Sequence, residues 1–273
     1  MSAGNASGGI IPGATAGARP LFWAVTLLGL ALVYAPAVYL LAASLNPGRQ
    51  LGLVPPSEFS LVWYQALGGE RRLLAALVES LWIGLATAVV ATPAGLAAAL
   101  AYRALQRGRG AFFLFLMFAL FVPGTIQGLG LSVVFKLVAV RPGWLAVAAS
   151  HVLWALPFAF TVSLMGLAAV KPSMEKAARD LGAGPWRTFA DVIFPLVRGA
   201  VVSAFVFSFL LSFNEYARAY YLVGRQNTLP LHMFGAMNAG TSPTIYAFSG
   251  LVLFGSILIV GLLGLMMGRR RGS

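Results

Sequence analysis

Six long apolar stretches restrict what this chain can fold into. Crossing a bilayer takes about 20 apolar residues in a helix, and lipid offers the backbone no hydrogen-bond partner, so such stretches should be helical. Only 10% of the residues are charged, against about 25% in a soluble domain. The sequence therefore predicts an all-α integral membrane protein with six transmembrane helices. These helices are expected at residues 21–45, 73–102, 111–140, 144–170, 196–223 and 245–267.

The pattern divides the chain into a membrane domain and two short ends. We expect a tail over residues 1–20, a six-helix transmembrane domain over 21–267 and a basic tail over 268–273. The first stretch is longer than the apolar region of a signal peptide, which has about 7–15 residues. We therefore interpret it as an uncleaved anchor. The connections between the stretches are too short for a separate soluble domain.

Proline and glycine interrupt some of the stretches. Pro123 and Gly124 break the third, and Pro157 lies in the fourth. Such breaks occur where a helix packs against protein or lines a cavity, and a packing kink explains each of them equally well. Small residues such as Gly84 and Gly95 predict that neighbouring helices approach closely.

The basic residues predict the orientation. Twelve of the 19 Lys and Arg residues fall in one set of connections and ends, and five fall in the other. Cytoplasmic connections carry the excess of positive charge, so both termini and the connection 171–195 are predicted to be cytoplasmic. The connections 46–72 and 224–244 then face outward. The same rule explains the net charge of +12 without a nucleic-acid partner.

Several kinds of chemistry find no support in the sequence. The chain has no cysteine, which excludes disulfides and thiolate chemistry. With two histidines and seven carboxylates, a metal site with several ligands is not expected. The phosphate-binding pattern G-x-x-x-x-G-K-[ST] is absent, so ATP binding of that kind is not expected.

The connection 171–195 specifies a short helix in detail. Ser173 is the predicted N-cap, Glu175 complements the dipole of the first turn, and Gly182 should end the helix. Pro185 should begin a second short helix, and Pro195 should mark the entry to the fifth stretch. An apolar face with helical spacing is formed by Met174, Ala177, Ala178 and Leu181. This helix either lies at the membrane surface and closes a loop, or is bound by a partner.

The same segment resembles the signature loop of permease subunits of binding-protein-dependent type I ABC importers. That pattern reads Glu-Ala-Ala, three residues, Gly, nine residues, Ile, one residue, Leu-Pro. Ala177-Ala178, Gly182 and Pro195 match it at the family's spacing. Val192 and Phe194 are conservative departures from the Ile and Leu.

Lys176 stands where the family has glutamate, and Glu175 precedes it by one residue. The role of that glutamate is therefore either taken over by Glu175 or altered in this chain. In the family, this short helix docks into a groove of a cytoplasmic ATPase and transmits its closure to the membrane helices. The resemblance implies a coupling role for Glu175, Lys176, Ala177, Ala178, Leu181, Gly182 and Pro195.

The resemblance also implies a set of partners. They are two ATP-binding subunits that hold ATP and magnesium, a second homologous permease, an extracytoplasmic solute-binding protein and the membrane lipids. The chain itself would then be a non-catalytic subunit without a cofactor of its own. Its expected location is the bacterial plasma (inner) membrane.

Ionisable residues inside a membrane span are costly and suggest function. The segment Asn214-Glu215-Tyr216 with Arg218 lies in the outer half of the fifth stretch. Glu215 and Arg218 are three residues apart and can pair on one helix face. These four residues either line the solute path or include a purely structural ion pair. Structural roles are favoured for Glu79, Lys136 and His151.

The last third of the chain suggests a subfamily. Thr228-Leu-Pro230, the segment 240–243 and Ala247 resemble the second permease subunit of spermidine/putrescine importers, which implies a polyamine-like solute. Relatives for aminophosphonate, thiamine or ferric iron remain alternatives. An ion-coupled secondary transporter, which needs an ion site near mid-membrane, is the alternative from another class. A structural membrane subunit without a path of its own is the third.

Overall fold

A computed structural model describes residues 18–48, 58–240 and 243–270 of the chain. Every regular element within those ranges is helical. The chain forms two compact units, one from residues 1–69 and 241–273 and the other from residues 70–240. Most of the predicted tail 1–20, and Arg271 of the basic tail, lie outside the described residues.

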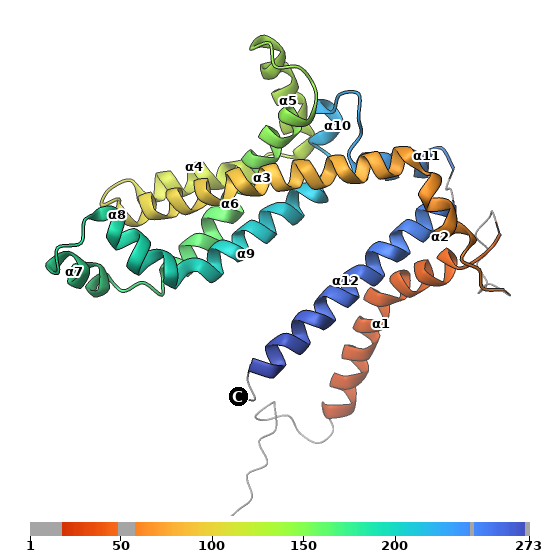
Figure 1. The fold of residues 1–273 in the computed structure, drawn as a ribbon, viewed down its shortest axis with the longest axis horizontal. Helices are drawn as coiled ribbons and strands as arrows, with labels where there is room; N and C mark the ends of the chain where they lie inside the picture. Colours follow the sequence, from red (N-terminus) through yellow and green to blue (C-terminus); the bar gives the residue numbers. More distant parts are fainter. Residues whose placement is uncertain (1–17, 49–57, 241–242, 271–273) are drawn as a thin grey trace, which may run out of the picture. The chain divides into compact units, whose positions relative to one another are not determined.

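The first unit pairs the two ends of the chain. Its helix α1 (Ala18–Ser44) packs against α12 (Pro243–Arg270) (Figure 1). The short helices α2 (Val62–Ala66) and η1 (Leu67–Gly69) pack on α12. The hydroxyl groups of Ser44 and Tyr64 are 2.7 Å apart. A Cβ on Gly250 would lie 2.6 Å from the Tyr64 hydroxyl, so this side chain packs directly against the backbone of α12.

The second unit is organised around three long helices that pack on one another, α3 (Arg71–Ala104), α6 (Trp144–Leu167) and α9 (Phe194–Phe213). Small residues bring them together, as the sequence predicts: a Cβ on Gly95 would lie 2.6 Å from the backbone of Ala159. The remaining elements are α4 (Arg109–Phe121), α5 (Gly124–Leu137), α7 (Pro172–Asp180), α8 (Pro185–Arg187), η2 (Thr188–Ile193), α10 (Ala219–Leu222) and α11 (Leu229–Asn238).

The third predicted span is sharply broken. Helices α4 and α5 meet at 99°, which is plain in Figure 1, and the break falls at the predicted Pro123 and Gly124. Proline has no N–H to donate and favours an extended residue before it; Val122 has ψ 123°. The pair is therefore either one broken span or a re-entrant loop.

The number of spans is partly confirmed. Four helices in the described residues are long and apolar enough to cross a membrane, or five if α4 and α5 form one span. The sixth predicted stretch falls within α12, of which Pro243–Gly255 qualifies as a shorter apolar helix. The count of six and the orientation of the termini stay predictions.

The limits predicted for the fifth span are wrong at both ends. Helical structure runs from Pro185 to Phe213 as one 29-residue candidate span, so Pro195 does not mark its start. The π-helical turn η2 precedes this proline, and a wider turn relieves the clash of its ring with the carbonyl four residues back. At the other end, the helix stops ten residues before the predicted Val223, because side chains of the segment 214–218 bond to the backbone there.

Candidate functional site

Helix α7 begins and ends at well-defined signals. Pro172 occupies the first helical turn and Lys171 is the N-cap, so the prediction of Ser173 as N-cap is wrong; the fixed φ of proline suits the first helical position. Gly182 has φ +83° and its N–H bonds to Arg179 O at 2.9 Å, while Ala183 N–H bonds to Ala178 O at 3.0 Å. This is a Schellman end, which confirms the predicted role of Gly182.

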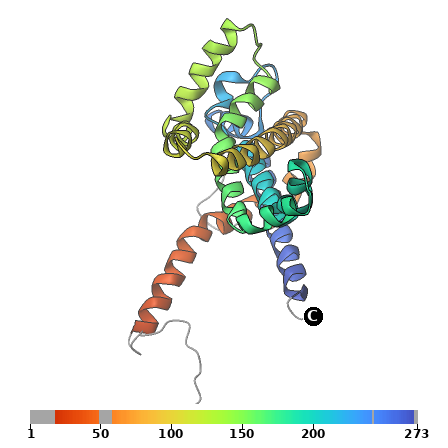
Figure 2. The ribbon, with the colours of Figure 1, turned by 90° about the vertical axis from the view of Figure 1, so that its left-hand side faces the viewer.

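The apolar side of this loop is accessible to solvent. Leu181 is 89% exposed and Trp186 is 75% exposed, and Lys176 and Ala177 are exposed beside them. The element lies at one end of the second unit, and Figure 2 turns that end toward the viewer. Leu181 follows the last residue of α7 and Trp186 lies in α8, so the exposed apolar side chains extend over both short helices of this loop.

Glu175 points the other way, into the protein. Its carboxylate lies 2.9 Å from Arg103 Nη2 at the end of α3, and its second oxygen lies 3.7 Å from Arg179 Nη2. The nitrogen of Arg103 also donates to Val170 O at 2.7 Å, just beyond α6. The structure therefore gives Glu175 an internal partner and leaves Lys176 exposed.

Glu215 and Arg218 form a mostly buried ion pair just after the C-terminal end of α9. This helix has 20 residues and is about 30 Å long, and α7 lies beyond its other end. The Arg218 Nη1 to Glu215 Oε2 distance is 2.9 Å, and the side chains are 4% and 10% exposed. Arg218 Nε also donates to Gln127 Oε1 at 2.7 Å, and its guanidinium lies 4.1 Å from the Trp154 ring centre. This cluster links the end of α9 to α5 and α6.

The other two predicted pathway residues are more accessible. Asn214 is exposed and Tyr216 is half-buried. The Tyr216 ring lies 4.6 Å from that of Phe234 in α11 and 6.0 Å from that of Tyr220. Asn214 caps α9 by donating to Leu210 O at 2.9 Å. The four predicted residues are thus together, but they divide into a buried pair and an accessible polar and aromatic edge.

A buried chain of hydrogen bonds joins the three central helices. His151 Nδ1 lies 2.7 Å from Ser212 Oγ, and Ser212 donates to Thr87 Oγ1 at 3.1 Å. All three side chains are buried. His151 is thus held inside the bundle, and its structural role stays a prediction. Thr87 and Ser212 were not predicted, because uncharged residues in apolar helices carry no distinctive sequence signal.

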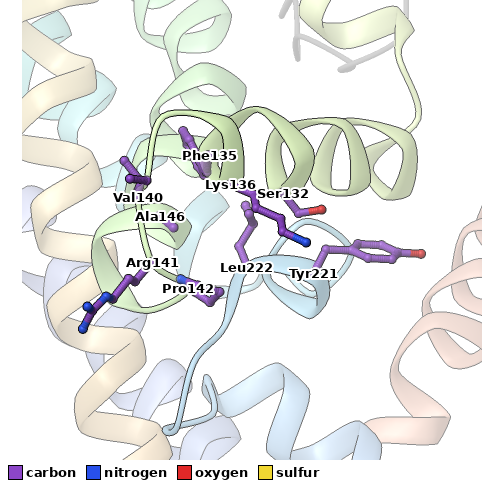
Figure 3. Close-up of a pocket in the computed structure, with 10 residues that line it drawn as sticks. Ser132, Phe135, Lys136, Val140, Arg141, Pro142, Ala146, Tyr221 and Leu222 are labelled. Carbon is purple, nitrogen blue, oxygen red and sulfur yellow. The ribbon is translucent and has the colours of Figure 1, made fainter.

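A cavity of about 560 Å³ lies between the loop after α5 and helix α10. It is lined largely by apolar residues together with Lys136 and Arg141, whose side chains extend in different directions (Figure 3). None of the four predicted pathway residues lines this cavity. In the described part of the chain, no group of three or more His, Asp or Glu residues is placed to hold a metal ion.

The fold of the chain is that of ABC importer membrane components. It is similar to a chain of a bacterial ABC transporter involved in the import of the acidic polysaccharide alginate, with a TM-score of 0.66 at 15% identity, over 94% of this chain and 99% of that one. A second solved structure, of an amino acid ABC transporter with histidines, has a TM-score of 0.52 at 16% identity, over 76% of this chain and 98% of that one. These likenesses concern the fold alone.

Residues 91–272 match the family described as binding-protein-dependent transport system inner membrane component, and the chain belongs to this family. It is 30% identical over 246 residues to the putrescine transport system permease protein PotI of Escherichia coli K12, covering 87% of this chain and 86% of that protein. It is 29% identical over 232 residues to the spermidine/putrescine transport system permease protein PotC of the same strain, covering 84% and 87%. The chain is thus a non-catalytic permease component of a transport system.

Proposed function

We propose that this chain forms half of the solute pathway of an ABC importer and that α7 is the element its ATPase subunit contacts. The observation that carries the proposal is the exposed apolar face of α7, with Leu181 89% exposed on a helix that ends sharply at Gly182. The distribution of basic residues supports a cytoplasmic location for this loop and for both termini. A second homologous permease and an extracytoplasmic binding protein complete the proposed importer.

Glycine substitutions on either side of Ala183 test the docking role of α7. Gly182→Ala places a Cβ at φ +83°, which costs about 1–2 kcal/mol and disturbs the end of α7. Gly184 has φ −69°, and a Cβ there would meet nothing within 4 Å, so Gly184→Ala is the matched control. We expect Gly182→Ala to lower both the ATPase recovered with the tagged permease and ATP-dependent uptake, and Gly184→Ala to leave both unchanged.

If the purified wild-type permease brings no ATP-hydrolysing subunit with it, the proposed function as an ABC importer component is contradicted. If Gly182→Ala and Gly184→Ala recover the same amount of ATPase and show the same uptake, the proposed role of the C-terminal end of α7 is contradicted. An ion-coupled secondary transporter is not supported, because the chain belongs to a binding-protein-dependent family. Uptake that follows an ion gradient rather than ATP would restore that alternative.

For the solute, we propose a polyamine. The support is the identity of about 30% to permeases named for putrescine and spermidine, over most of each chain. Glu215 is engaged by Arg218, so it does not offer a free carboxylate to a cation. Within the proposed pathway, Asn214 and Tyr216 are the residues available to the solute, and Glu215 with Arg218 holds the turn that presents them.

Uptake into proteoliposomes that contain the whole importer tests the solute. We expect labelled putrescine or spermidine to accumulate with ATP, and unlabelled polyamine to compete while thiamine, aminophosphonate and ferric iron do not. ATP-driven uptake of one of those three solutes instead would replace the polyamine while leaving the importer class intact.

A further inference from the structure

A single side chain joins three elements at the α7 end of the second unit. Arg103 lies in the last turn of α3, and its Nη2 donates to Val170 O at 2.7 Å, just past α6. The same nitrogen lies 2.9 Å from Glu175 Oε1 in α7. One guanidinium therefore connects α3, the end of α6 and α7.

This connection is partly sheltered from water. The side chains of Arg103 and Glu175 are 25% and 20% exposed, and Val170 is buried in the core shared by α3, α6 and α9. Charge-assisted hydrogen bonds of this kind are stronger than neutral ones. The second partner of Glu175, Arg179, is 64% exposed at 3.7 Å, and an exposed pair along one helix contributes little.

Helix α7 otherwise has limited contact with the long helices. Among the described elements it packs mainly against η2, which leads directly into α9. The Arg103–Glu175 pair is thus a direct side-chain link from α7 to α3. Without it, a displacement of α7 would reach α6 and α9 along the chain but would be poorly transmitted to α3.

We propose that Arg103 is a positioning residue that carries movement of α7 into α3 through Glu175. The inference rests on the proposed docking of an ATPase on α7. It also accounts for the order Glu175-Lys176. Successive helical residues are about 100° apart, so the inward glutamate serves the link while Lys176 faces the partner side.

The test uses the complete importer in proteoliposomes, with the solute that the wild-type importer takes up. Arg103→Gln removes the charge, and Arg107→Gln is the control, because Arg107 is exposed in the connection that follows α3. We expect Arg103→Gln to retain the ATPase subunit and its hydrolysis of ATP while uptake per ATP falls about tenfold, within the usual range of coupling between sites. Arg107→Gln should match the wild type.

A charge exchange separates coupling from general damage. Arg103→Glu with Glu175→Lys restores an opposite-charge pair, and we expect it to recover several-fold more uptake per ATP than either single variant. Arg103→Gln with a wild-type ratio of uptake to hydrolysis would overturn the inference while leaving the proposed function intact. Failure of the exchange to improve on the single variants would also overturn it. A wild-type importer that recruits no ATPase would instead overturn the proposed function.

Discussion

At the residue scale, the contacts of Arg218 determine what its neighbourhood can do. The side chain of this cation is 4% exposed and is surrounded by Glu215, Gln127 and Trp154. The Glu215 carboxylate also accepts the backbone N–H of Arg218 at 3.1 Å. The pair therefore fixes the turn after α9, and the spacing of three residues along the sequence predicted the pairing but not its burial.

Removing one charge of this pair should destabilise the protein strongly. Glu215→Gln leaves Arg218 buried without a counter-charge, a change that costs about 3–5 kcal/mol. The measurement is unfolding of the purified complex in detergent by heat or denaturant. Glu58→Gln, at an exposed position, is the control and should have little effect.

The double variant Glu215→Gln with Arg218→Gln removes both charges. It should be more stable than Glu215→Gln alone, because no uncompensated charge remains. If Glu215→Gln unfolds like the wild type and reduces only uptake, the pair belongs to the solute path rather than to the scaffold.

At the element scale, the contact between α3 and α6 depends on the absence of a side chain. A Cβ on Gly95 would lie 2.6 Å from the carbonyl carbon and the Cβ of Ala159. Backbone atoms cannot move aside as a flexible side chain can, so the two helices must separate to admit a methyl group. The sequence predicted close packing at Gly95 from residue size, without identifying the partner helix.

Gly95→Ala should therefore weaken the bundle despite its better helix propensity. Overpacking of this kind costs about 1–3 kcal/mol. We therefore expect Gly95→Ala to have a lower midpoint of thermal unfolding than the wild type. Gly199→Ala is the matched control, because Gly199 is also helical and a Cβ there meets nothing within 4 Å. An unchanged midpoint for Gly95→Ala would show that this helix contact is looser than described.

Local sequence signals predicted some elements and failed for others. Gly182 ends α7 and Pro185 starts α8 as predicted, because both residues act through their own backbone geometry. The end of α9 at Phe213 was missed, because apolar residues continue through Tyr220, Tyr221 and Leu222. Asn214 and Glu215 stop the helix through side-chain bonds to the backbone, which hydropathy does not register.

At the scale of the whole molecule, orientation in the membrane is open to a direct test. The chain has no cysteine, so single cysteines can report on sidedness. We expect Arg107→Cys to react with a membrane-impermeant maleimide only when the cytoplasmic side is accessible, and Arg225→Cys only from the outside. Both positions are exposed, so burial does not limit labelling. The opposite pattern would reverse the topology deduced from the basic residues.

The sequence alone predicted an integral membrane protein from its bilayer-length apolar runs, and the loop 171–195 carried the resemblance to ABC importer permeases, because both signals lie along the chain and need no knowledge of its packing. It also located α7 and its glycine end. Only the tertiary structure decided that Glu175 faces Arg103 and that Arg218 is buried against Gln127 and Trp154. These partners lie tens of residues apart in the chain, and their meeting depends on how α3, α5, α6 and α9 pack.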